Sequence, residues 1–171
     1  MPAALDRILD ALAEPGQPGP PLRALEAVAR ETVGAKLFTV MAYDPPTAMA
    51  HRLHTSDPAA YPVSGAKPLP AGPWSATVIE GKRPFVANTI EAIAEVFPDH
   101  ALIDSLGCQS VVNVPVIFDG QVIGTVNLLH ETGFYTPGRV DAAMALRPCA
   151  TLALLAALAA GTMNSAGRTD P

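Results

Sequence analysis

The sequence has few cysteines and few basic residues, and each shortage excludes a class of protein. Its two cysteines, Cys108 and Cys149, are too few for a disulfide framework and lie too far apart for metal-ligand spacing. We therefore expect two buried thiols in a reducing compartment. Only 11 residues are Lys or Arg, none of them clustered, and the net charge is -5. Binding to nucleic acid or to an anionic membrane surface is therefore not expected.

Targeting and membrane-spanning segments are also missing. The N-terminus has no basic stretch followed by an apolar run, so no secretory signal is predicted. Arg147 and Pro148 interrupt the most apolar stretch, residues 142–160, and leave too short a run to span a bilayer. We expect that stretch to be a buried helix and the protein to be cytoplasmic.

The composition predicts a single globular domain. Of the 171 residues, 49% are hydrophobic and 16% are charged, a balance that supports a packed core. We expect an N-terminal helix and linker at residues 1–19, the globular domain at 20–160 and a flexible C-terminal tail at 161–171.

Hydrophobic periodicity and turn residues predict an α+β fold with an antiparallel sheet. Helices are expected at 3–13, 21–32, 73–80, 89–106 with a break at Pro98, and 137–160 with a kink at Pro148. Strands are expected at 37–43, 48–55, 85–87, 110–118 and 121–130. The proline-rich segment 56–73 is predicted to be an ordered loop or lid without regular structure.

The two strands at 110–118 and 121–130 form a hairpin around Asp119-Gly120. A two-residue turn would place Asn113 opposite Val126 and put the two asparagines of the hairpin on different faces. A three-residue loop, with Gly120 left-handed in a bulge, shifts the pairing of the two strands by one residue and puts both asparagines on the same face. We expect the longer loop, because it gives one apolar face, including Val122, and one mixed face that carries both asparagines.

Two segments of the hairpin region carry a family pattern: Ser105-Leu-Gly-Cys-Gln-Ser-Val-Val-Asn-Val-Pro-Val116 and Gly120-Gln-Val-Ile-Gly-Thr-Val-Asn-Leu-Leu129. They resemble the C-terminal half of GAF domains, and the order of elements agrees with that family over about residues 20 to 160. In the GAF fold, which is related to the PAS fold, the terminal helices pack on one face of the sheet. The resemblance implies that the other face holds a ligand pocket.

The resemblance and the mixed face of the hairpin together suggest which residues bind a ligand. Asn113, Thr125, Asn127 and Leu129 are expected to face the pocket, under a lid that runs from Tyr61 to Trp74. Buried amides also commonly satisfy buried backbone groups or ordered water, and this alternative stays open.

The segment before and into the helix at 73–80 adds further candidates. Trp74 and Ser75 stand at a helix N-terminus, which favours an anionic group, and Lys67 is expected to supply a charge partner. The alternatives are that Trp74 is a core or subunit-contact side chain and that Lys67 is solvated.

Neither catalytic nor metal-binding residues are expected. His51 and His54 are predicted to lie on opposite faces of a strand and cannot chelate one ion. Some stand-alone GAF domains are free methionine-(R)-sulfoxide reductases, which need reactive and resolving cysteines. Cys149 lies inside an apolar helix, and Cys108 departs from the spacing of that family and has no cationic neighbour to lower its pKa.

The function expected from the sequence is that of a sensory or regulatory GAF domain. It would bind an unidentified small molecule, without a cofactor, and signal to a separate partner because no output domain is evident. The alternatives are a reductase-like enzyme and a structural or partner-binding dimer without a ligand. The last helix is apolar nearly all round, so we expect a homodimer through the N- and C-terminal helices.

Overall fold

The computed structural model describes residues 2–44, 47–63, 66–69 and 71–166. Its helices are α1 (Pro2–Ala13), α2 (Gly19–Thr32), α3 (Pro73–Ser75), the π-helical segment η1 (Ala76–Glu80), α4 (Ile90–Ala94), α5 (His100–Ser105), α6 (Pro137–Met144) and α7 (Arg147–Ala166). Its strands are β1 (Leu37–Asp44), β2 (Met49–Thr55), β3 (Ala66–Pro68), β4 (Phe85–Ala87), β5 (Ser110–Phe118) and β6 (Gln121–His130).

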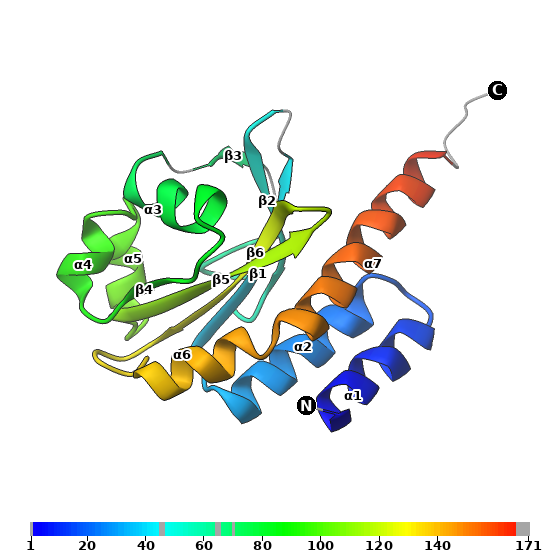
Figure 1. Ribbon diagram of the computed structural model, residues 1–171, viewed down its shortest axis with the longest axis horizontal. Coiled ribbons are helices and arrows are strands. Elements are labelled where there is room, and N and C mark those ends of the chain that lie inside the picture. Colours follow the sequence, from blue (N-terminus) through cyan, green and yellow to red (C-terminus); the bar gives the residue numbers. More distant parts are fainter. Residues whose placement is uncertain (1, 45–46, 64–65, 70, 167–171) are drawn as a thin grey trace.

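In the described part of the chain the six strands form one antiparallel sheet in the order β3-β2-β1-β6-β5-β4. Helices α2, α6 and α7 lie on one side of the sheet, and α3, α4 and α5 lie on the other (Figure 1). Helix α1 packs against α2 and α7 and so forms an outer layer. The predicted α+β architecture, with terminal helices on one face, is confirmed.

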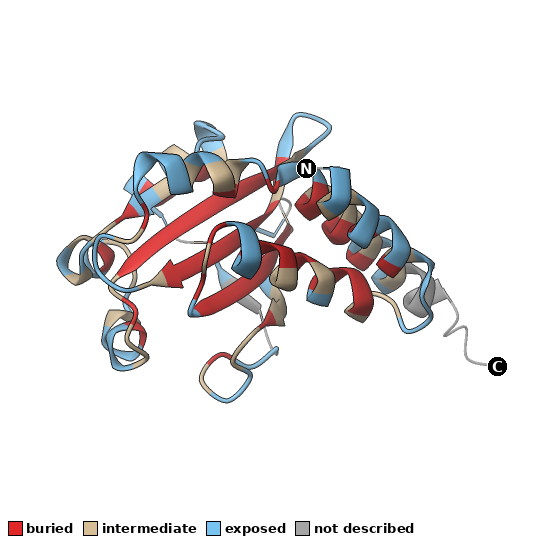
Figure 2. Cartoon of the chain, turned by 90° about the horizontal axis from the view of Figure 1, so that it is seen from below, coloured by how far each residue is buried: buried red, intermediate tan, exposed pale blue. Residues whose placement is uncertain are grey.

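The central strands are largely buried (Figure 2), and their two faces bury different kinds of side chain. On the side of the terminal helices, Val112, Val114 and Val126 pack into one apolar core with α2 and α7. On the other side the apolar residues divide into two clusters, one beneath α4 and α5 and one beneath α3 and η1. The expected apolar and mixed faces are thus present. On the mixed face the buried polar residues lie between the two apolar clusters.

The hairpin places both asparagines on one face as predicted, but through a bulge within the strands and not through a longer loop. Its loop has only two residues, Asp119 and Gly120, both with positive φ, rather than the expected three. The parity changes further along, where Val116 pairs with Gly124 but Ile117 pairs with Val122. This bulge leaves one residue of β6 unpaired and moves Val122 to the pocket side, where it joins the cluster beneath α3. The prediction that Val122 belongs to the apolar face was therefore wrong.

A second bulge corrects the prediction for the two histidines. Val40 pairs with His54, whereas the next residue of β1, Met41, pairs with Arg52. The alternation of β2 is therefore broken at Leu53, and His51 and His54 lie on the same face, that of the terminal helices. His54 Nε2 is 2.7 Å from Glu26 Oε2 of α2.

The proline-rich segment and the last helix also differ from expectation. Ala66–Pro68 forms β3, which pairs with β2 at the edge of the sheet, where a proline is tolerated. The last helix does not end near residue 160 but continues to Ala166, and residues 167–171 lie outside the described part of the chain. Gly161 lacks the positive φ that ends a helix, and a helical glycine costs only about 1 kcal/mol.

The predicted kink in the last apolar stretch is present. Helices α6 and α7 are bent by 43° relative to each other at a break just before Pro148. Among the described residues, no single helix is long and apolar enough to cross a membrane, although this bent pair passes that test by length and composition.

Candidate functional site

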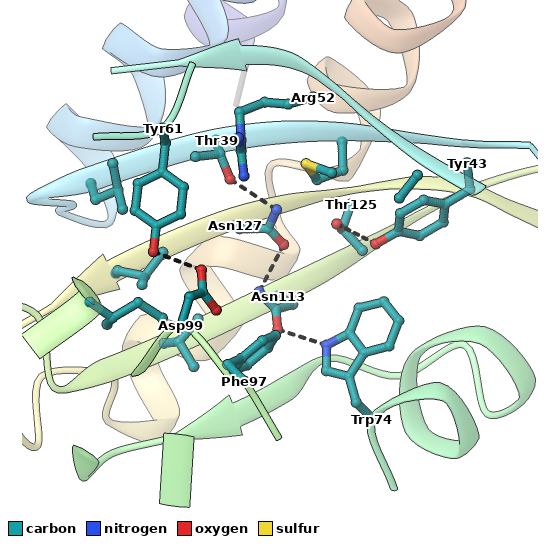
Figure 3. A pocket seen from close by; sticks show the side chains of 16 residues that line it. Thr39, Tyr43, Arg52, Tyr61, Trp74, Phe97, Asp99, Asn113, Thr125 and Asn127 are labelled. Carbon is teal, nitrogen blue, oxygen red and sulfur yellow. Dashed lines mark hydrogen bonds between the residues drawn. The ribbon is translucent and has the colours of Figure 1, made fainter. Parts of the chain in front are cut away.

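A partly enclosed cavity of about 90 Å³ lies on the mixed face of the sheet, opposite the terminal helices (Figure 3). On the same measure a single water needs about 10 to 15 Å³, so the cavity has room for a small ligand. The lining comes from the strands, the segment between β2 and α3, α3 itself, the segment before α5 and the first turn of α5. Its residues are Leu37, Thr39, Met41, Tyr43, Ala50, Arg52, Tyr61, Trp74, Phe97, Asp99, Ile103, Val111, Asn113, Thr125, Asn127 and Leu129.

A row of hydrogen-bonded side chains crosses the floor of this pocket. Trp74 Nε1 donates to Asn113 Oδ1 at 2.9 Å, and Asn113 Nδ2 donates to Asn127 Oδ1 at 2.7 Å. Asn127 Nδ2 in turn donates to Thr39 Oγ1 at 3.1 Å. All four side chains are buried, so each bond satisfies a group that would otherwise be costly to remove from water. The row fixes the orientation of both amides.

A second buried polar pair lies beside this row. The hydroxyls of Tyr43 and Thr125 are 2.7 Å apart, and burial raises the pKa of Tyr43 well above its ordinary value. The tyrosine is therefore a neutral hydroxyl at physiological pH. Its ring also makes an edge contact with Trp74, with the ring centroids 6.2 Å apart.

The opposite end of the pocket carries the charged residues. Tyr61 OH donates to Asp99 Oδ2 at 2.9 Å, and the Arg52 guanidinium lies over the Tyr61 ring, 4.9 Å from its centroid. Arg52 Nη1 donates to the carbonyl of Pro62 at 3.0 Å, whereas its buried Nε has no hydrogen-bond partner among the described residues. Burial lowers the pKa of Arg52, and the proximity of Tyr61 and Asp99 opposes that shift.

Local structure explains how Tyr61 and Asp99 meet. The Asp57 carboxylate accepts the amides of Ala59 and Ala60, and its carbonyl accepts the Tyr61 amide at 2.9 Å, which builds a tight turn after β2. Asp99 stands at the N-cap position of α5, yet its carboxylate makes no capping bond and accepts from Tyr61 instead. The Tyr61–Asp99 bond therefore ties the lid segment to α5.

Six of the eight residues predicted to bind a ligand line the pocket: Tyr61, Trp74, Asn113, Thr125, Asn127 and Leu129. Ser75 is half-buried in α3 but is not a lining residue. Lys67 pairs with Ala50 through the backbone of β3, and its side chain lies outside the described part of the structure. The two asparagines bond to each other and to the side chains of Trp74 and Thr39, rather than to buried backbone groups.

Sequence reasoning missed both charged lining residues. Arg52 reaches the pocket face only because the bulge at Leu53 reverses the alternation of β2, and no turn residue in that strand signals a bulge. Asp99 follows Pro98, which was recognised only as a helix break. Thr39, Met41 and Tyr43 are alternate residues of β1, so they share the face that lines the pocket. This strand is buried on both faces, so its sequence lacks the alternation of polar and apolar residues that would have identified this face.

The cysteines do not form a redox pair. Cys108 belongs to the cluster beneath α4 and α5, whereas Cys149 belongs to the core on the opposite side of the sheet, and both are buried free thiols. Burial raises the pKa of each thiol. Contrary to the expectation of no cationic neighbour, the charge of Lys36 lowers the pKa of Cys108, but the larger effect of burial raises it. No group of three or more described His, Cys, Asp or Glu side chains is placed to hold a metal ion.

Comparisons with solved structures agree with this fold. The GAF domain of a phosphoenolpyruvate-protein phosphotransferase from Acinetobacter superposes with a TM-score of 0.69 at 13% identity, covering 94% of this chain and 96% of that one. The GAF domain of a two-component sensor histidine kinase from Bacillus halodurans gives 0.64 at 9% identity, with 84% and 95% covered.

An enzyme is also similar in structure. Free methionine-R-sulfoxide reductase from Neisseria meningitidis, solved with its substrate, gives a TM-score of 0.64 at 16% identity, covering 92% of this chain and 89% of that one. No curated protein sequence matches significantly. The family model of the GAF domain, however, matches residues 22–156. The chain therefore belongs to the GAF domain family.

Proposed function

We propose that this protein is a sensory or regulatory GAF domain that binds a small molecule in the pocket between the sheet and the Tyr61–Trp74 segment. GAF domains are typically sensory or regulatory, and similar solved structures include GAF domains of sensor histidine kinases. The observation that carries the proposal is the convergence of oriented polar groups from β1, β2, β5, β6 and α3 on one cavity of about 90 Å³. Concave sites with an apolar lining and a few fixed polar groups are typical of ligand pockets.

The proposal is tested by a thermal-shift screen of organic acids, amino acids, nucleotides and neutral metabolites, with isothermal titration of each compound that stabilises the protein. Asn113→Leu and Trp74→Ala change the pocket floor, and Asp119→Ala, in the distant hairpin turn, is the matched control. We expect compounds that bind the wild type and the control but bind the two pocket variants less tightly. Undiminished binding to both pocket variants, or no binding compound at all, would refute the proposal.

Signalling would pass to a separate partner, and the active form is proposed to be a homodimer through α1 and α7. Within the chain, α1 and α2 already cover part of α7. Leu9 of α1 and Leu158 of α7 nevertheless remain 49% and 38% exposed. Light scattering at micromolar concentration tests the dimer, and a monomeric mass would contradict it.

We propose no enzymatic activity, although one similar structure is a reductase. A disulfide between Cys108 and Cys149 would require them to meet, and they belong to cores on opposite sides of the sheet. An assay of methionine-(R)-sulfoxide reduction with a thiol reductant is expected to show no turnover. Turnover that is lost in Cys108→Ser would overturn this part of the proposal.

A further inference from the structure

The guanidinium of Arg52 is held in the pocket wall with most of its five N–H donors unused. Its Nη1 donates to the carbonyl of Pro62, and its Cζ lies 4.9 Å from the centroid of the Tyr61 ring. Its Nε is buried, and no described group accepts a hydrogen bond from it. Nε is too deeply buried to meet a ligand. Nη2 makes no hydrogen bond to a described residue and is not among the fully buried atoms, so it is open to an acceptor. The natural partner for Nη2 is an anionic acceptor that occupies the pocket.

The only carboxylate among the described pocket-lining residues does not supply that acceptor. Asp99 accepts from Tyr61 and makes no ion pair with Arg52 within 4.0 Å among the described residues. The tyrosine side chain therefore contacts both charges, through its ring on one side and its hydroxyl on the other (Figure 3). The wall offers a cation with a free donor, and close by a negative charge that is already hydrogen-bonded.

We propose that Arg52 binds the carboxylate of a small monoanionic ligand whose apolar body lies against the sheet. This inference rests on the proposed function and names the ligand class of the same pocket. Guanidinium and carboxylate groups match in geometry and form strong charge-assisted hydrogen bonds. Leu37, Met41, Ile103, Val111 and Leu129 supply the apolar surface for the body of the ligand.

The charges of the described lining residues select against other anions. Among them one cation faces one carboxylate, so their charges sum to zero before the ligand enters. A phosphate or dicarboxylate would bring a second negative charge close to Asp99, with no second cation among the described lining residues to balance it. A monocarboxylate brings one charge for Arg52, and an α-amino acid adds an ammonium that Asp99 can attract. The shared chemistry is a single carboxylate, and the role of Asp99 distinguishes the two sources.

The test uses matched compounds that differ in charge. Pentanoate, its neutral amide pentanamide and its α-amino form 2-aminopentanoate are titrated calorimetrically, together with the straight-chain carboxylates from acetate to hexanoate. We expect at least one carboxylate or amino acid to bind and its neutral amide to bind about tenfold more weakly or not at all. Equal binding of acid and amide would overturn the proposal.

Variants locate the carboxylate in the pocket. Arg52→Gln is expected to weaken binding about 100-fold and Arg52→Lys, which keeps the charge but loses the planar fork of guanidinium donors, about tenfold. Arg83→Gln, which removes an exposed arginine outside the pocket, is the matched control and is expected to bind like the wild type. Thermal melts verify that each variant is folded. Undiminished binding to folded Arg52→Gln would overturn the proposal.

Asp99→Asn keeps an acceptor for Tyr61 and removes the negative charge. It is expected to strengthen binding of a monocarboxylate several-fold and to weaken binding of an amino acid relative to it. If the ratio of the two affinities does not move, Asp99 has no part in selecting the ligand.

Failure of this inference is distinct from failure of the proposed function. If no carboxylate in the panel binds but a neutral or cationic compound binds and loses affinity in Trp74→Ala, the pocket is a ligand site and the carboxylate assignment is wrong. If no compound of any class binds, both are wrong.

Discussion

Asn113 and Asn127 stand directly opposite each other on β5 and β6, and Asn113 Nδ2 donates to Asn127 Oδ1 at 2.7 Å. Each amide also bonds outward, Asn113 to Trp74 and Asn127 to Thr39. The pair therefore links β1, β5, β6 and α3 through side chains alone, across the floor of the pocket. Such a row is stable only while every member is present, because each removal leaves a buried polar group unpaired.

Replacing one amide of the pair is expected to destabilise the fold. Asn113→Leu leaves Trp74 Nε1 and Asn127 Oδ1 without their present partners. Each unpaired group costs about 1 to 3 kcal/mol, partly offset by the added apolar surface, so we expect a loss of about 2 kcal/mol. The free energy of unfolding from urea denaturation, followed by circular dichroism, measures it. A loss below about 0.5 kcal/mol, typical of a surface substitution, would contradict the role of the row.

The coupling between the two amides is measured by a double-mutant cycle. Asn127→Leu alone is expected to destabilise in the same way as Asn113→Leu. The double variant should lose less than the sum of the single losses, by about 1 kcal/mol, because replacing both partners leaves fewer unpaired groups. Strict additivity would show that the bond between the two side chains contributes nothing.

Gly124, beside the bulge of β6, admits no side chain. A Cβ at this position would lie 2.1 Å from the carbonyl oxygen of Met41 and 2.7 Å from Leu154 Cδ2. Gly124→Ala is therefore expected to lower the free energy of unfolding by about 3 kcal/mol. Gly138→Ala is the matched control, because nothing lies within 4 Å of its Cβ and it stands in the first turn of α6. Equal stability of the two variants would show that β1 and β6 do not approach so closely.

The layers and the pocket face could be predicted from the sequence, whereas the charged end of the pocket could not. Asn113 and Asn127 were assigned to one face because the apolar face of one hairpin strand must lie beside the apolar face of the other, and the mixed face beside the mixed face. That assignment was correct although the loop length was wrong, since the parity depends only on one extra residue somewhere in the hairpin. In β2 nothing in the sequence indicates that Leu53 is an extra, bulged residue. The pocket-facing position of Arg52, which depends on this bulge, was therefore not predicted.

The Tyr61–Asp99 bond is expected to restrain the lid segment. Tyr61→Phe removes the only described hydrogen bond of this side chain and should speed hydrogen exchange of the backbone amides of Ala59, Ala60, Tyr61 and Val63, measured by mass spectrometry, about tenfold. Tyr135→Phe is the control, because its hydroxyl donates to the carbonyl of Gly34, outside the pocket lining. Unchanged exchange in the Tyr61 variant would contradict a tie between the lid and α5.

Stability is expected to fall in alkaline solution. Burial raises the pKa of Cys108 and Cys149, and of Tyr43 and Tyr135, above their ordinary values. Each group therefore stays protonated longer in the folded than in the unfolded chain. The unfolded chain releases protons first, so the free energy of unfolding is retained below about pH 8.5, where thiols begin to ionise, and decreases above it.

Urea denaturation between pH 7 and pH 10.5 measures this decline. Cys108→Ala with Cys149→Ala should remove the part that begins near the ordinary thiol pKa and leave the part that begins near pH 10, where tyrosine ionises in the unfolded chain. A free energy of unfolding that rises through this range would contradict the burial of these groups.

The most direct test of the account follows the indole of Trp74, the only tryptophan in the chain, whose Nε1 hydrogen-bonds to Asn113 in the pocket floor. Its single indole N–H signal in a ¹H–¹⁵N NMR spectrum is monitored while a compound that raises the melting temperature is added. We predict a saturable shift of this signal with the dissociation constant found by calorimetry. A stabilising compound that saturates the protein and leaves the signal unmoved would contradict binding in this pocket.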